Sequence, residues 1–122
     1  MKHAIVCAWA LASPALAEPM VDVTLPRLTG DAIIGAKVFA ARCATCHGEA
    51  GAGHSAKGPP LIHKIYEPSH HGDVAFLLAA EAGVRAHHWD FGNMPAVNGI
   101  TRGEVAMVVD YIRQVQRANG ID

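Results

Sequence analysis

The residues best able to do chemistry are two cysteines and a histidine in the sequence Cys43-Ala44-Thr45-Cys46-His47. C-x-x-C-H is the attachment sequence for covalently bound haem. Two thiols one short turn apart can add to the two vinyl groups along one edge of a porphyrin, and the histidine that follows then lies under the ring. The motif therefore predicts haem attached through Cys43 and Cys46, with His47 as an iron ligand.

Two other kinds of site use cysteines at this spacing. A thioredoxin-like redox site requires a strand followed by a helix, whereas this pair is expected at the end of a helix and ahead of a glycine-rich loop. A structural zinc site needs four ligands, and the chain has no second cysteine pair to complete the set. Haem attachment is favoured over both.

A methionine in a later loop is the candidate for the second axial ligand. Met94 precedes Pro95 in a loop that has Gly92 before it and Gly99 after it, so its thioether is not constrained by a helix. A thioether favours reduced iron relative to a second imidazole, and it leaves the iron closed to substrates. His47 and Met94 together would suit an electron carrier. Met107 lies in a predicted helix and is interpreted as core packing.

The chain is rich in histidine, with eight in total, of which His3 lies near the N-terminus. Besides His47, the remaining six are His54, His63, His70, His71, His87 and His88. Any of these six could displace Met94 and give bis-histidine iron with a lower potential, although solvated surface histidines are more common. The pairs His70-His71 and His87-His88 could form a second metal site only if the fold brings them together.

The elements that position these residues follow from apolar spacing and turn signals. A first helix is predicted over 31–42, with Asp31 as its cap and with Ile34, Val38 and Phe39 on one face. Residues 48–60 hold four glycines and two prolines and are predicted to form an ordered loop.

The second half of the chain is predicted to hold two more helices. Residues 73–82 show helical spacing, with Gly83 as the stop, and 84–99 is again predicted to be loop. Thr101 and Glu104 have the spacing of a capping box. The helix that they begin continues to Asn119-Gly120 with apolar residues at Val105, Val108, Val109, Ile112 and Val115.

Composition agrees with a small all-α domain. Of the 122 residues, 51% are hydrophobic but only 6% aromatic, which fits helices better than an aromatic-rich β-barrel. A net charge of −1 does not suggest the basic surface that binds nucleic acid. A chain of this size has room for one domain, and small domains often use a cofactor to complete the core.

The N-terminus has the features of a secretory signal. Lys2 precedes a mostly apolar run, and Ala15-Leu16-Ala17 has the small-x-small form of a cleavage site, so cleavage after Ala17 is predicted to leave Glu18 at the new N-terminus. A retained membrane anchor is the alternative, but Ser13-Pro14 interrupts the run. The sequence thus predicts a signal peptide over 1–17, an arm over 18–30, a single domain over 31–122, and a periplasmic location.

With these motifs in view, the chain resembles the class I c-type cytochromes over about 31–119. Gly35 and Phe39 precede Cys43 at the spacing of that family, and Val108 and Tyr111 match the residues of its last helix that cross the first helix at the glycine. The resemblance implies the all-α cytochrome c fold, with three or more helices around one covalently attached haem c and with the N- and C-terminal helices crossing.

The resemblance also implies roles for two further residues. Gly58-Pro59-Pro60-Leu61 is similar to the family loop in which a proline carbonyl accepts a hydrogen bond from the proximal histidine, which gives that role to Pro59 and orients His47. Trp89 stands near the place where the family hydrogen-bonds its haem propionates, and its indole N–H could donate such a bond. Packing of Trp89 in the core, with the histidines before it on the surface, remains the alternative.

The function implied is single-electron transfer between exported or membrane-bound redox proteins by a monomeric carrier that is not an enzyme and binds no nucleic acid. One alternative is a haem enzyme or ligand sensor in which Met94 is displaced from the iron. Another is a dedicated subunit of a larger oxidase or dehydrogenase.

Overall fold

The computed structural model describes residues 18–122, and within this range the protein is helical and contains no strand. The predicted signal peptide and its cleavage site lie outside the described residues. The elements in chain order are α1 (Ala32–Arg42), α2 (Ala44–His47), η1 (Glu49–Gly51), η2 (Lys64–Tyr66), α3 (Asp73–Ala82) and α4 (Arg102–Ala118). The predicted all-α class is confirmed.

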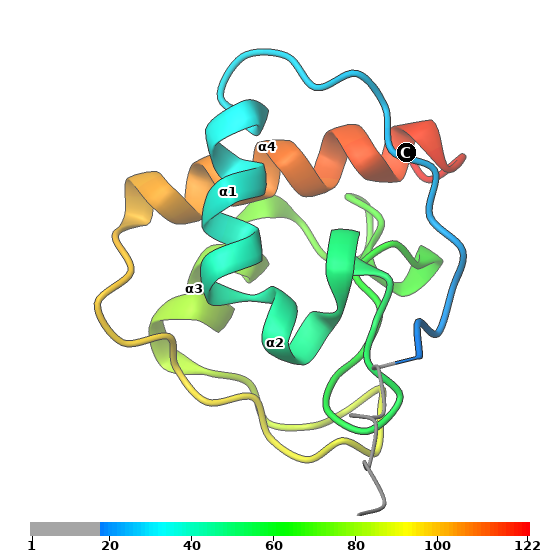
Figure 1. The fold of residues 1–122 in the computed structure, drawn as a ribbon. Helices are drawn as coiled ribbons and strands as arrows, with labels where there is room; N and C mark the ends of the chain where they lie inside the picture. The colour runs from blue at the N-terminus through cyan, green and yellow to red at the C-terminus, as the bar shows by residue number, and fades with distance from the viewer. Residues whose placement is uncertain (1–17) are drawn as a thin grey trace, which may run out of the picture.

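The first and last helices cross, as Figure 1 shows for α1 and α4. The crossing is centred on Gly35, where an added Cβ would overlap the backbone carbonyl of Met107. Only glycine therefore allows the two backbones to approach this closely. Beside it, the rings of Phe39 and Tyr111 pack with their centroids 5.5 Å apart, and both belong to the core cluster together with Val108. The predicted crossing is confirmed.

Replacing Gly35 with valine is expected to lower the free energy of unfolding by about 3 kcal/mol, the upper end of typical overpacking costs, because the new side chain meets backbone that cannot rotate away. Gly103→Val is the matched control, since Gly103 lies in exposed α4 surface and its nearest neighbour is 4.0 Å from an added Cβ. Guanidinium denaturation measures both changes. Equal stability of the two variants would show that the helices do not depend on this contact.

The C-terminal helix α4 forms as its sequence predicts. The Thr101 hydroxyl accepts from the Glu104 N–H at 3.2 Å, and the Glu104 carboxylate accepts from the Thr101 N–H at 2.8 Å, so the capping box is complete. All five apolar residues predicted along this helix, Val105, Val108, Val109, Ile112 and Val115, are buried. The helix therefore contributes one long apolar face to the core.

The first helix differs from its prediction in two details. Asp31 makes no side-chain capping hydrogen bond, because its own backbone is already helical (φ −66°, ψ −20°) and not extended as in a capping residue. Ile34 is 50% exposed, so it does not share the buried face. That face consists of Ala32, Gly35 and Phe39, and Ile34 is turned about 100° from its neighbour Gly35 around the helix axis.

The second predicted helix is confirmed as α3 with its predicted bounds, and it ends at Gly83, which has a φ of +76°. The segment 84–99 that follows is loop, with one backbone bridge between Val84 and Met94. The sequence did not predict the short helix α2. Among the described residues, no helix is long and apolar enough to cross a membrane.

The segment before α1 has no helix or strand and runs along the molecule toward the end of α4 (Figure 1). It is tied to the domain by hydrogen bonds from the backbone N–H groups of Met20 and Val21 to the Ala52 carbonyl. The Asn119 side chain both donates to and accepts from the backbone of Thr24, at 2.9 Å in each case. These hydrogen bonds hold the segment before α1 against the C-terminal end of α4.

Candidate functional site

One large cavity of about 810 Å³ opens among α1, α2, α3, α4 and the loop between α3 and α4. It lies within the roughly 300–1,000 Å³ of sites that bury a sizeable organic ligand. All six residues singled out from the sequence line it: Cys43, Cys46, His47, Pro59, Trp89 and Met94. The fold thus brings together residues as far apart in the chain as Cys43 and Met94.

The two cysteines are placed by the change from α1 to α2. The Cys43 N–H donates to the Phe39 carbonyl and so ends α1, and the Cys46 N–H donates to the Cys43 carbonyl at 3.1 Å. The cysteines form no disulfide with each other. Burial raises the pKa of the Cys43 thiol to about 11, with the Arg42 charge opposing the effect, so a free thiol here is protonated at neutral pH. Both sulfurs thus remain available on the cavity wall.

The imidazole of His47 is held by a hydrogen bond from its Nδ1 to the carbonyl oxygen of Pro59 at 2.9 Å. Because a carbonyl can only accept, Nδ1 carries the proton and Nε2 keeps its lone pair. Burial lowers the pKa of His47, and the Pro59 hydrogen bond partly opposes this shift. The ring is therefore neutral, fixed in one tautomer, and able to bind a metal through Nε2.

The contact between His47 and Pro59 depends on Gly58. A Cβ on Gly58 would lie 2.6 Å from the Cys46 carbonyl oxygen, so the proline loop can lie against the C-x-x-C-H turn only with glycine at this position. The Gly53 N–H donates to the His47 carbonyl at 2.7 Å and ties the same turn from the other end of the glycine loop. The glycine-rich composition of this loop thus serves close backbone packing around the histidine.

The methionine is placed by a backbone bridge. Met94 and Val84 exchange two N–H···O hydrogen bonds of 2.9 Å. Gly83 lies against the same segment, because a Cβ there would overlap the Met94 carbonyl and lie 3.1 Å from the Ala96 nitrogen. Gly83, predicted only as a helix stop, therefore also lets the methionine segment pack against the end of α3. Met107, by contrast, does not line the cavity.

Trp89 carries a polar atom that the protein itself leaves unpartnered. Its indole Nε1 is the one buried side-chain nitrogen or oxygen without a hydrogen-bond partner among the described residues. The nearby Tyr66 hydroxyl, whose pKa is raised by burial, is not within hydrogen-bonding geometry of this nitrogen. A buried N–H of this kind costs free energy unless a ligand accepts from it.

The rest of the cavity wall is largely apolar, and no sequence motif marks its residues as part of a site. Phe76 and Leu78 of α3 and Val105 and Val109 of α4 line it. Leu78 is 53% exposed, so part of its side chain is open to a ligand in the cavity. Helical spacing placed Val105 and Val109 on an apolar face, but spacing does not distinguish core contacts from ligand contacts.

These features fit the haem that the C-x-x-C-H motif predicts. Two thiols and a fixed imidazole would meet the edge and the iron of a porphyrin, the apolar wall would contact the ring, and the unpartnered Trp89 N–H would suit a carboxylate acceptor.

The histidines divide into two groups. The His54 Nδ1 accepts from the Ala56 N–H within its own turn, while the His63 ring packs edge-on against Trp89 at 5.3 Å, and neither lines the cavity. His71, His87 and His88 do line it, and His70 contacts His88 at the rim. The fold therefore brings the two histidine pairs together. Desolvation and the neighbouring histidines lower the pKa of His88.

Comparison with known proteins gives two results. No curated protein matches the chain. The family model described as "Cytochrome c" matches residues 32–116, which is well over half of the chain and spans α1 through most of α4. The match includes all six candidate site residues. The chain therefore belongs to the cytochrome c family, the haem-containing electron-transfer proteins that bind haem c covalently.

Proposed function

We propose that this protein is a one-electron carrier whose haem c is held by the six residues around the cavity. The observation that carries the proposal is that Cys43, Cys46, His47, Pro59, Trp89 and Met94 line one cavity. When bound there, the haem supplies an iron that changes between Fe(II) and Fe(III) and so stores or releases one electron. The protein's own contribution is to fix the ligands and exclude competing ones.

Cys43 and Cys46 would hold the porphyrin through thioether bonds, and His47 would ligate the iron. The Pro59 carbonyl accepts a hydrogen bond from the His47 Nδ1–H at 2.9 Å, which leaves Nε2 free to bind a metal and increases the basicity of the imidazole. This outer hydrogen bond makes Pro59 a positioning residue and not a ligand. The support for this role is geometric, since Gly58 packs closely against the Cys46 backbone and so holds Pro59 beside His47.

Met94, which lines the same cavity, would ligate the iron through its thioether. The Val84 bridge holds its backbone, and Gly83 lets the segment approach α3. A soft thioether stabilises the reduced iron and keeps the sixth position filled. Trp89 would donate its unpartnered indole N–H to a haem propionate, which would give this buried N–H the acceptor that the protein does not supply.

The rival function is a haem enzyme or ligand sensor in which Met94 leaves the iron. The two functions differ in whether the sixth position is open, so adding carbon monoxide to the reduced holoprotein separates them. A carrier should show an unchanged haem spectrum. Rapid formation of the carbon monoxide complex by the unmodified protein would instead favour the enzyme or sensor.

The partners of a carrier are redox proteins, either free or membrane-bound, and a monomer suffices for the task. Contacts between electron-transfer partners are small, under about 1,200 Å², so no extensive interface is needed. A dedicated subunit of a larger oxidase or dehydrogenase would differ in remaining bound through purification from its own host. A free carrier should instead separate as a monomer.

The carrier works outside the cytoplasm, with a signal peptide over 1–17, an arm over 18–30 and the cytochrome domain over 31–122. Lys2 and the Ala15-Leu16-Ala17 site support export to the periplasm. Mass spectrometry of the protein made in its own host should find Glu18 at the N-terminus. Recovery of the full chain beginning at Met1, with no shorter form, would contradict export.

A further inference from the structure

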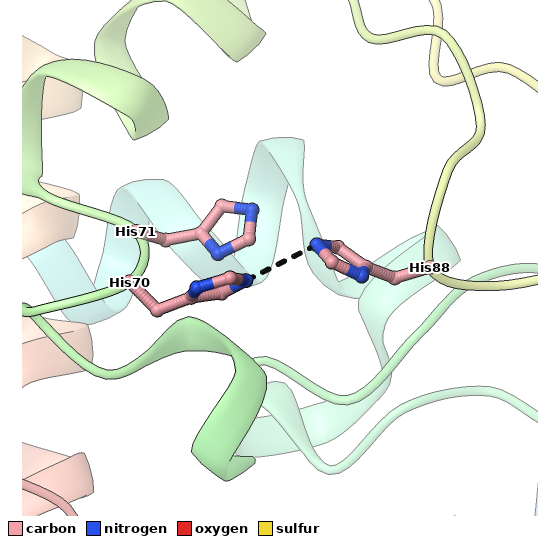
Figure 2. A group of neighbouring side chains, drawn as sticks. All are labelled: His70, His71 and His88. Carbon is pink, nitrogen blue, oxygen red and sulfur yellow. Dashed lines mark hydrogen bonds between the residues drawn. The ribbon is translucent and has the colours of Figure 1, made fainter.

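Four histidines from two separate segments meet at the rim of the cavity. His70 and His71 follow η2, while His87 and His88 lie in the loop after α3. Figure 2 shows the rings of His70, His71 and His88 gathered at one point. One ring nitrogen from each of these three lies within 4.8 Å of the other two, and the Nε2 atoms of His70 and His88 are 3.4 Å apart.

The distance between the His70 and His88 Nε2 atoms is close to that between two nitrogens bound to one metal ion. In a tetrahedral zinc site the Zn–N distance is about 2.0–2.1 Å, which places two ligand nitrogens about 3.3–3.4 Å from each other. His70 and His88 already have this separation. Both are exposed, so side-chain rotation can bring them closer to the half-buried His71 without disturbing the core.

The third histidine, His71, is prepared for metal binding by its hydrogen bond. Its Nδ1 donates to the Ile65 carbonyl at 2.7 Å, which fixes the proton on Nδ1 and leaves the lone pair on Nε2. Metal-binding histidines commonly have such a carbonyl partner on the second ring nitrogen. His87 has the same arrangement, because its Nδ1 donates to the Arg85 carbonyl at 2.8 Å.

Hydrogen bonds from Arg113 of α4 anchor the backbone that carries His70 and His71. This arginine is 6% exposed, and its guanidinium donates to the carbonyls of His71 and Tyr66 and to the side chains of Asp73 and Gln116. The segment between η2 and α3 is thus fixed to α4. An ion at the rim would meet one anchored ligand and two adjustable ones.

The loop that carries His87 and His88 is also fixed by hydrogen bonds. The Ala86 N–H donates to the Asn93 side chain at 2.9 Å, and the Val84–Met94 bridge closes the base of the same loop. His87 stacks on His71 with ring centroids 5.9 Å apart and an interplanar angle of 23°. The His87 ring therefore lies beside the three-histidine group.

We propose that His70, His71 and His88 form a binding site for a divalent transition-metal ion, with the remaining coordination position left to water or to His87. Neutral imidazoles suit zinc and copper(II), whereas magnesium and calcium prefer oxygen ligands. The site rests on these side chains alone and not on the proposed electron-transfer function, although His71 and His88 also face the cavity.

Isothermal titration calorimetry, with zinc ion added to the purified holoprotein, tests the site. A saturable isotherm with one zinc per chain is expected. His70→Ala and His88→Ala should each weaken binding at least tenfold, because each removes one of three ligands. His54→Ala is the matched control and should leave binding unchanged, since His54 is half-buried in the glycine loop and outside the cluster.

Zinc K-edge X-ray absorption of the unmodified holoprotein gives a second measurement that needs no variant. Scattering from three or four imidazoles at about 2.0–2.1 Å supports the site. Fewer imidazoles, no saturable binding, or equal weakening by His54→Ala would overturn it. If haem propionates occupy the histidines, zinc will not bind the holoprotein, and the proposal fails while the haem assignment stands.

The haem spectrum of His88→Ala separates this site from the iron. An unchanged spectrum together with weakened zinc binding supports a second metal site. A changed axial-ligand spectrum would assign His88 to the haem iron and overturn both the zinc site and the assignment of Met94.

Discussion

Replacing Met94 with alanine is expected to remove the thioether-to-iron absorption band, lower the reduction potential and allow reduced iron to bind carbon monoxide. The methyl group left behind cannot reach the iron, and loss of a soft sulfur ligand destabilises Fe(II) relative to Fe(III). Axial ligands set haem potentials over a range of about 0.8 V, so the shift should be large compared with the effect of any packing change. Optical spectra and a redox titration measure these changes.

The matched control is Met107→Ala. Met107 is half-buried in α4 and does not line the cavity, so its loss should reduce stability through packing and leave the band and the potential unaltered. An unaltered spectrum and potential in Met94→Ala would mean that another side chain binds the iron. His87 and His88 are the first candidates, because both line the cavity.

The second large effect is expected from the attachment cysteines. Changing both Cys43 and Cys46 to serine in a host with the maturation machinery should abolish covalent attachment, because a serine hydroxyl does not replace a thiol in the thioether bond. Each single change should leave one bond and sharply lower haem retention. Acid and organic-solvent extraction followed by intact mass measurement counts the attached haem.

Thr45→Ala is the control for the cysteine variants. Thr45 lies between the two cysteines on the exposed side of α2 and does not line the cavity, so its loss should leave haem attachment intact. If haem can be extracted from the unmodified protein, or if the double serine variant keeps its haem through extraction, attachment through these sulfurs is wrong.

The sequence predicted the elements whose signals are local. The capping box at Thr101 and the apolar spacing that follows it specify α4, and Gly83 marks the end of α3. Asp31 did not form the predicted helix cap, because capping depends on backbone angles that residue type does not determine. Burial of Ile34 was also predicted wrongly from spacing. Several faces of α1 are apolar, and only contact with α4 decides which face is buried.

Long-range contacts could not be predicted in the same way. Cys43, Cys46 and His47 form a local motif, and Met94 was expected from its position in a loop ahead of Pro95, but the roles of Pro59 and Trp89 came only from the family resemblance. The structure places all of them around one cavity.

Other features had no sequence signal at all. The anchoring of the His71 segment by Arg113 links residues 42 positions apart, and no spacing rule connects them. The meeting of His70 with His88 is likewise a property of the folded chain.

The central claim is that the cavity holds a low-spin haem c with one histidine and one methionine ligand, and the optical spectrum of the purified holoprotein in both oxidation states tests it most directly. We expect low-spin iron in both states, a thioether-to-iron band in the oxidised protein, and loss of that band on reduction by one electron. A high-spin spectrum, or a low-spin spectrum without the thioether band, would contradict the account.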